Sequence, residues 1–207
     1  MTVVVTEGTA ERHLTSERCT LTIRVAREAP TSEAATQSAS HRVLALAERV
    51  TQLRASGAAT WHQVTPVTSW LRKWHDDQGV EHSAWVAAAE VRVKLSDLTL
   101  VGPLSNDMAA EGYTVVPAWD LTEATRRSVL REVRVEAVRS ARERAEDYAT
   151  ALDARVIDIL ELADAAGQGF AGSPRAAAAS FGAAAAELVT IPEQTVSARV
   201  TARFDVR

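Results

Sequence analysis

The chain has 207 residues, 46% of them hydrophobic and 24% charged, a composition typical of a soluble globular protein that excludes a disordered or collagen-like chain. Its net charge of −4 offers no general attraction to phosphate backbones, so nucleic acid is not expected as a partner. Cys19 is the one cysteine, which excludes an internal disulfide and any site built from paired cysteines. No run approaches the roughly 20 apolar residues of a membrane span, and the first residues lack the apolar core of a secretory signal. We therefore expect a cytoplasmic protein.

Two strands and a helix are predicted in the first part of the chain. Residues 17–28 alternate apolar and polar side chains, which predicts a strand with one buried face. Residues 3–13 are rich in Val and Thr and are predicted to pair with that strand through a turn at 14–16. Beyond them, apolar residues recur at steps of three and four, which predicts an amphipathic helix that is capped by Thr31 and ends at Gly57.

A long hairpin is predicted next. Residues 61–74 and 83–95 form its two strands, joined by a polar Asp-Asp-Gln-Gly turn at 76–79 in which the glycine supplies a positive φ. Alternate residues from Trp85 to Leu95 are apolar, while the residues between them include charged side chains. One face of this sheet is therefore expected to be covered and the other solvated.

Two more helices follow the hairpin. The short one lies within 97–112 and is expected to begin near 99–102, because Pro103 is tolerated only in a first turn. The long one follows a strand at 113–119, opens with a capping-box spacing from Asp120 to Glu123, and runs to about residue 152. Its predicted buried stripe consists of Leu130, Val133, Ala137, Ala141, Ala145, Tyr148 and Leu152.

The remaining segments complete an α+β pattern. Residues 156–162 and 196–206 are predicted strands, and 164–186 is an Ala-, Gly- and Ser-rich flexible loop between them. The resulting order is β-β-α-β-β-α-β-α-β-loop-β, which lacks the regular alternation of a parallel α/β sheet. It favours antiparallel sheets backed by two long helices and one short helix.

Several segments together carry a family resemblance. They are the Thr6-Glu7-Gly8 opening, Ala29-Pro30-Thr31 before the first helix, Gly57 after it, Thr65-Pro66 in the third strand, and Val156-Ile157-Asp158-Ile159 after the long Ala/Arg/Glu helix. With this order of elements, the chain resembles the SIMPL domain family over almost its whole length.

The resemblance implies a bacterial protein of α+β fold, with residues 1–207 forming one SIMPL-like unit of two interleaved subdomains. The family includes a bacterial periplasmic immunogenic protein, and its general biochemical role is not established. Some members assemble into large rings, so the resemblance also implies a homo-oligomer. Only Gly8 remains of the family's usual Gly-x-Gly near the first strand, and the export signal common among members is absent.

One motif suggests a cofactor. Residues 167–172 read G-x-G-x-x-G, with Glu187 where a ribose-binding acid could lie, which is the pattern of a dinucleotide site. That mechanism requires a strand directly before the first glycine and a helix opening at the last, but Ser173-Pro174 follows the motif. We therefore interpret the segment as part of the flexible loop and expect no cofactor.

A metal site at the hairpin tip is a second possibility. His75, Asp76, Asp77 and His82 flank the turn, and a cross-strand pair of the two histidines would bring metal ligands together. Polar residues at a hairpin tip are also what turn formation demands, so no metal ligand and no catalytic residue is assigned. Cys19 lies on the apolar side of its strand, where burial would keep the thiol inert.

The tryptophans indicate an interaction surface. All five fall on predicted strands, and Trp70 and Trp74 share a face with Arg72. Together with Trp85 these residues form the candidate interface or ligand surface, with core packing as the alternative. The sequence thus favours a non-enzymatic, self-assembling protein. A small-ligand or peptide binder is the alternative, and a metal-dependent enzyme ranks third.

Overall fold

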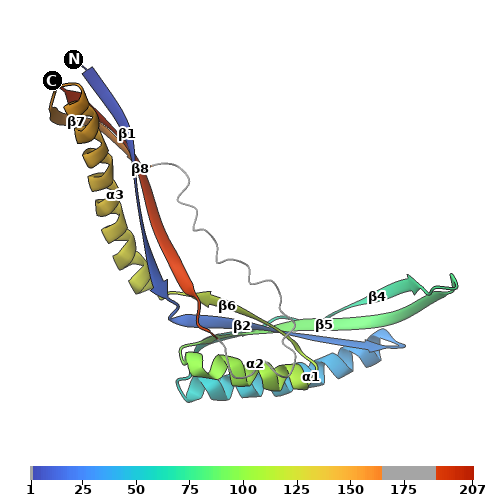
Figure 1. Ribbon diagram of the computed structural model, residues 1–207. Coiled ribbons are helices and arrows are strands. Elements are labelled where there is room, and N and C mark those ends of the chain that lie inside the picture. The colour runs from blue at the N-terminus through green and yellow to red at the C-terminus, as the bar shows by residue number, and fades with distance from the viewer. Residues whose placement is uncertain (1, 165–189) are drawn as a thin grey trace. The chain divides into compact units, whose positions relative to one another are not determined.

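The computed structural model describes residues 2–164 and 190–207, which fall into two units (Figure 1). The central unit comprises residues 17–120 with 190–191, and the terminal unit comprises 2–16, 121–164 and 192–207. Both contain antiparallel sheets with helices against them, which confirms the predicted α+β class. The glycine motif at 167–172, and the predicted loop beyond residue 164, lie outside the described residues.

The elements follow the predicted order with one additional strand. The central unit contains β2 (Arg18–Ala29), α1 (Ser32–Ala55), β3 (Ala59–Val64), β4 (Thr68–His75), β5 (Glu81–Leu95), a 3₁₀ turn (Leu98–Leu100), α2 (Val101–Ala110) and β6 (Thr114–Asp120). The terminal unit contains β1 (Thr2–Thr15), α3 (Glu123–Ala151), β7 (Val156–Asp164) and β8 (Glu193–Val206).

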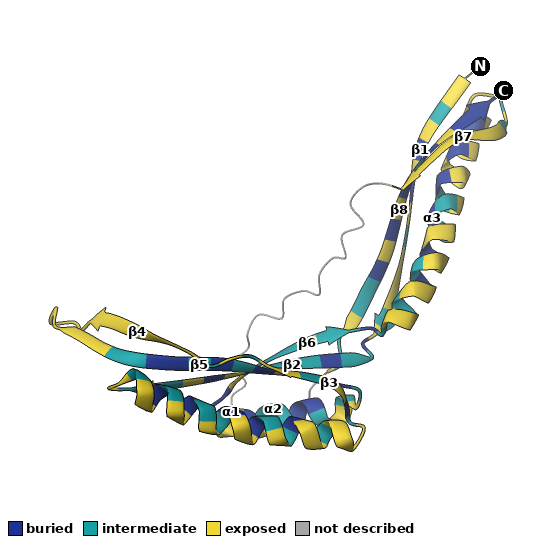
Figure 2. Ribbon diagram, turned by 180° about the vertical axis from the view of Figure 1, so that it is seen from behind, coloured by how far each residue is buried: buried dark blue, intermediate teal, exposed yellow. Residues whose placement is uncertain are grey.

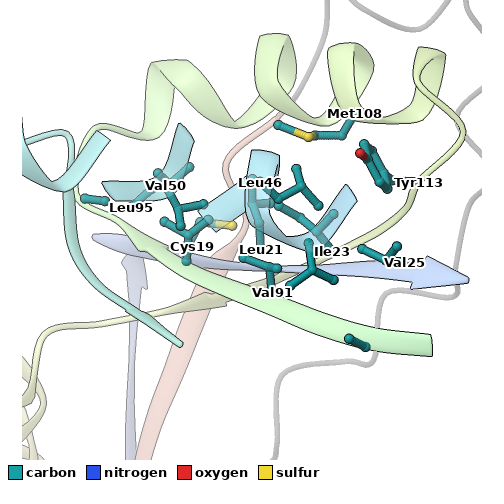
Figure 3. Packing of buried hydrophobic residues seen from close by; sticks show 14 of the residues in the cluster. Cys19, Leu21, Ile23, Val25, Leu46, Val50, Val91, Leu95, Met108 and Tyr113 are labelled. Atoms are coloured by element: carbon teal, nitrogen blue, oxygen red, sulfur yellow. The ribbon is translucent and has the colours of Figure 1, made fainter. Parts of the chain in front are cut away.

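The central unit contains a sheet of strand order β3-β5-β2-β6, and β4 pairs with the N-terminal half of β5, from Glu81 to Ala88. Helices α1 and α2 cover one face of this sheet (Figure 1). The core lies between them and includes Leu21 and Ile23 from β2, Leu46 from α1, Val91 from β5 and Met108 from α2 (Figure 3). The predicted alternation along β2 and β5 is confirmed, because the buried residues of both strands face these helices.

Helix α1 begins and ends where the sequence predicts. The Thr31 hydroxyl oxygen accepts a hydrogen bond from the backbone N–H of Ala34 at 3.2 Å, so Thr31 is the N-cap. At the other end, Gly57 has a φ of 80°, the left-handed conformation that ends many helices. Both ends are therefore fixed by local chemistry.

The predicted strand 61–74 is two strands. β3 and β4 are separated at Thr65 and Pro66, where the ladder to β5 takes up one additional residue: Val64 pairs with Val91, and Thr68 pairs with Ala88. Proline cannot donate a hydrogen bond to the ladder, which accounts for the interruption at Pro66. The Thr65 side chain fills the gap, since its hydroxyl oxygen accepts from the backbone N–H of Glu90 at 2.8 Å.

The terminal unit is a three-stranded sheet of order β1-β8-β7. β1 pairs with β8 along its entire length, from Thr2 against Val206 to Thr15 against Glu193, so the predicted pairing of 3–13 with 17–28 is wrong. The predicted turn at 14–16 does not close a hairpin, because the backbone N–H and hydroxyl of Ser16 both donate to the Pro192 carbonyl. Period-two alternation identifies a strand but does not identify its partner.

Helix α3 packs against β1 and β8, through a stripe that differs from the predicted one. Its N-cap is Thr122, whose hydroxyl accepts from Thr125 N–H, and Asp120 belongs to β6. Tyr148 and Leu152 are each 58% exposed. The predicted burial of Val133, Ala137, Ala141 and Ala145 is confirmed, and Leu130 is only partly buried. The buried residues recur at steps of four: Val129, Val133, Ala137, Ala141, Ala145 and Ala149.

Close packing against β1 explains this stripe. A Cβ placed on Gly8 would lie 1.8 Å from the carbonyl oxygen of Ala137 and 2.8 Å from the Ala141 methyl group. The helix and strand backbones are therefore almost in contact, and only small side chains fit between them. The Thr6 hydroxyl completes the junction by donating to the Ala141 carbonyl at 2.7 Å.

Candidate functional site

The outer strand of the central hairpin, β4, carries two exposed tryptophans, Trp70 and Trp74. All eight residues of β4 are exposed, and within the described residues β4 pairs only with β5 (Figure 2). Trp70 lies opposite Val86 and Trp74 opposite His82, on the face away from α1. Trp70 and Trp74 remain 47% and 38% exposed, although each has a strand neighbour.

The structure brings three of the four candidate surface residues together. Arg72 shares the face of Trp70 and Trp74, because alternate residues of a strand point the same way. Trp85 lies opposite Leu71 on the other face, where it packs against a small cluster that contains Ala87. Trp85 therefore does not share the exposed surface, and packing against α1 accounts for its position.

Stacked and charged side chains continue along this face. The Arg72 guanidinium contacts the Glu28 carboxylate at 2.9 Å and lies 4.7 Å from the centre of the Trp74 ring. Trp74 in turn stacks on His82, with ring centres 5.6 Å apart and an interplanar angle of 23°. His82 Nε2 lies 2.8 Å from Asp76 Oδ2. We call Glu28, Arg72, Trp74, His82 and Asp76 the stacked ladder.

The hairpin tip does not bring the two histidines together as the metal hypothesis required. His75 lies opposite Glu81, and His82 lies opposite Trp74, so the expected cross-strand pair of histidines is wrong. Asp76 Oδ1 accepts the backbone N–H groups of Gln78 and Val80 and thereby shapes the turn. Within residues 2–164 and 190–207 there is no group of three or more side chains suited to hold a metal ion.

The pKa values of Asp76 and Cys19 are shifted in opposite directions. The hydrogen bond with His82, followed by those from the backbone of Val80 and Gln78, lowers the pKa of Asp76. Burial raises the pKa of the Cys19 thiol to about 12, against a smaller opposing contribution from a backbone hydrogen bond with Ala118. At neutral pH the thiol is protonated and buried, which makes it a poor nucleophile.

A second exposed apolar strand was not recognised from the sequence. β7 is an outer strand of the terminal sheet, and α3 lies mainly over β1 and β8 rather than over β7. Its ladder to β8 shifts twice, leaving Ile157 and Leu160 without a partner residue. Four of its aliphatic side chains are exposed: Ile157, Ile159, Leu160 and Leu162. The signal in the sequence is that apolar residues occur in adjacent pairs around Asp158 and Glu161, so they fall on both faces of the strand rather than on one buried face.

The family model named SIMPL, described as a protein of unknown function (DUF541), matches residues 4–204. The chain belongs to the SIMPL family. The predicted family is thereby confirmed over nearly the entire SIMPL chain, and the match extends over both of the units that the structure describes. No curated protein matches the chain. None of the helices in the described part of this SIMPL protein combines the length and apolarity needed to cross a bilayer.

Proposed function

We propose that this SIMPL protein functions by self-association rather than by catalysis, and that copies of the chain meet through exposed strands. The observation that carries the proposal is β4, an outer strand on which Trp70, Leu71 and Trp74 are all exposed. Monomeric proteins rarely leave apolar side chains gathered in this way, and tryptophan and arginine are enriched at the centres of protein interfaces.

The exposed tryptophan rings would contribute part of the stability of an assembly. A tryptophan offers about 150–250 Å² of surface, and Trp70 and Trp74 each expose between a third and a half of theirs. Covering about 100 Å² on each ring contributes roughly 2–3 kcal/mol per side chain at ~25 cal/mol per Å². The open edge of β4 adds backbone groups that a second strand would satisfy.

The mass of the protein in solution tests this proposal. Light scattering coupled to size exclusion, and native mass spectrometry at tens of micromolar, are expected to give a multiple of the 22.3 kDa chain mass. The double variant Trp70→Gln/Trp74→Gln is expected to shift the mass toward the monomer. Leu44→Gln is the control, because Leu44 is an exposed apolar side chain on α1, away from β4. A strict monomer for the unmodified chain would refute the proposal.

A small-ligand or peptide binder is the second candidate, favoured by the stacked ladder. Arg72 and Trp74 present a cation beside an aromatic ring, on a face of the sheet that neither α1 nor α2 covers. Such a pair suits a planar or anionic ligand group. Tryptophan fluorescence against a set of metabolites and short peptides tests this function, with Trp74→Phe as the variant expected to lose the response. The absence of any response across the set would reject it.

A further inference from the structure

We propose that β4 of one copy docks along β7 of a second copy, an inference that rests on the proposed self-association and names its two surfaces. The first argument is charge. β4 carries Arg72 and Lys73 and no acidic residue. β7 carries Asp158, Glu161 and Asp164 and no basic residue. Each strand therefore complements the other.

Both strands are also open and apolar. Within the described residues β4 pairs only with β5 and β7 only with β8, so each presents one edge of unpaired backbone groups. Trp70 and Leu71 project from β4 on opposite faces, and exposed aliphatic side chains project from β7. Joining the two edges would extend the sheet and cover apolar side chains on both of its faces.

Like charges disfavour the symmetric alternatives. Two copies of β4 placed edge to edge would bring their Arg72 and Lys73 cations together, and two copies of β7 would bring their carboxylates together. The mixed pair is the arrangement in which charge attracts. Because every copy has one β4 and one β7, the contact is head-to-tail, and repeating it gives a ring or an open filament.

The ion pairs that β4 and β7 already make within one copy do not oppose the docking of β4 on β7 of another copy. On β4, Arg72 contacts Glu28 and Lys73 contacts Glu81 at 2.7 Å. On β7, Glu161 contacts Arg203 at 3.2 Å and Asp164 contacts Arg134 at 3.8 Å, and all of these pairs join exposed side chains. Such surface pairs contribute little to stability, so replacing them by pairs between copies costs little. The Asp158 carboxylate accepts a hydrogen bond from the adjacent backbone N–H of Ile159 at 2.8 Å, a local contact that pairing between copies would leave in place.

Charge reversal with mixing tests the pairing. Arg72→Glu/Lys73→Glu makes β4 acidic and leaves β7 acidic, whereas Asp158→Arg/Glu161→Arg leaves β4 basic and makes β7 predominantly basic. Each variant alone is expected to self-associate at least about tenfold more weakly than the unmodified protein. An equimolar mixture of the two is expected to recover assembly, because each β4 then meets a β7 of opposite charge. Glu143→Arg/Asp147→Arg on exposed α3 positions changes the net charge by the same amount and is expected to assemble normally.

A crosslink in the unmodified protein gives an independent readout that needs no variant to fold. The chain has two lysines, Lys73 and Lys94, so a carbodiimide that joins amines to nearby carboxylates reports on few positions. Mixed isotope-labelled and unlabelled copies are expected to give products that join Lys73 to Asp158, Glu161 or Asp164 of another copy. Lys94, on β5, is the internal control and is expected to give no product with β7.

The outcomes separate this inference from the proposed function. A monomeric unmodified protein overturns both. Assembly that survives the β7 reversal, or Lys73 products confined to single copies, overturns the pairing of β4 with β7 and leaves self-association standing. Loss of assembly in each variant, recovery in the mixture and Lys73 products between copies support the pairing.

Discussion

Gly8→Ala tests the close contact between β1 and α3. The added methyl group would lie 1.8 Å from the Ala137 carbonyl oxygen and 2.6 Å from the Ala141 nitrogen, both backbone atoms that cannot rotate away. Ordinary van der Waals contacts lie near 3.5 Å, so the helix must retreat by roughly 1.5 Å. That retreat would also stretch the 2.7 Å hydrogen bond from the Thr6 hydroxyl to the Ala141 carbonyl.

The expected cost follows from these contacts. Overpacking of a well-packed junction costs roughly 1–3 kcal/mol, and loss of one buried hydrogen bond adds about 1 kcal/mol. Gly8→Ala is therefore expected to destabilise the protein by about 2–4 kcal/mol and to lower Tm by roughly 10 °C. Urea unfolding and thermal melting followed by circular dichroism measure both quantities.

Thr9→Ala is the matched control for this substitution. Thr9 is the next residue of β1, is exposed and points away from α3, so its substitution is expected to leave Tm nearly unchanged. If Gly8→Ala melts within about 1 °C of the unmodified protein, the backbones are not in the contact described, and the explanation of the alanine stripe fails with it.

Three further predictions concern other parts of the molecule. Val133→Ala removes two buried methyl groups from the stripe of α3 and is expected to cost about 2 kcal/mol, whereas Tyr148→Ala is expected to change stability by less than about 0.5 kcal/mol. Chemical denaturation measures both free energies of unfolding, and equal effects would contradict the burial pattern. Cys19 is expected to resist a disulfide reagent at pH 8 in the folded protein and to react at once in denaturant, and a reactive native thiol would contradict this. Because the pKa of Cys19 is about 12 in the folded protein and 9.0 in the unfolded chain, the free energy of unfolding is expected to fall as the pH rises from about 9 toward 12. His82→Ala removes the hydrogen bond that contributes most to the lowered pKa of Asp76, so an NMR titration is expected to show that pKa rising toward the ordinary aspartate range. An unchanged pKa would mean that the backbone N–H groups alone keep the pKa of Asp76 low.

Local chemistry predicted much of the fold. The bounds of α1 follow from a capping hydroxyl at Thr31 and a glycine at 57, and the position of α2 follows from Pro103 in its first turn. The buried faces of β2 and β5 follow from alternation. Each of these signals involves residues a few positions apart, which is the range over which a sequence can be interpreted without knowing the fold.

The candidate surface was predicted less completely for the same reason. Parity along one strand placed Trp70, Arg72 and Trp74 on one face, because that relation is local. Trp85 was grouped with them although it belongs to another strand, and only the register between β4 and β5 shows that it faces α1. The exposure of β7 was missed because it depends on where α3 lies over the sheet.

The sequence by itself determined the family and most of the elements, though not the division of residues 61–74 into β3 and β4, because propensity, capping and periodicity act within a few residues. Only the tertiary structure decided that β1 pairs with β8, 178 positions apart at Thr15 and Glu193. It also decided that the buried stripe of α3 continues to Ala149 and leaves Tyr148 and Leu152 exposed. Strand partners and helix faces are set by which surfaces pack together without voids or clashes, and at Gly8 that condition is met because a strand and a helix approach to within the width of one missing methyl group.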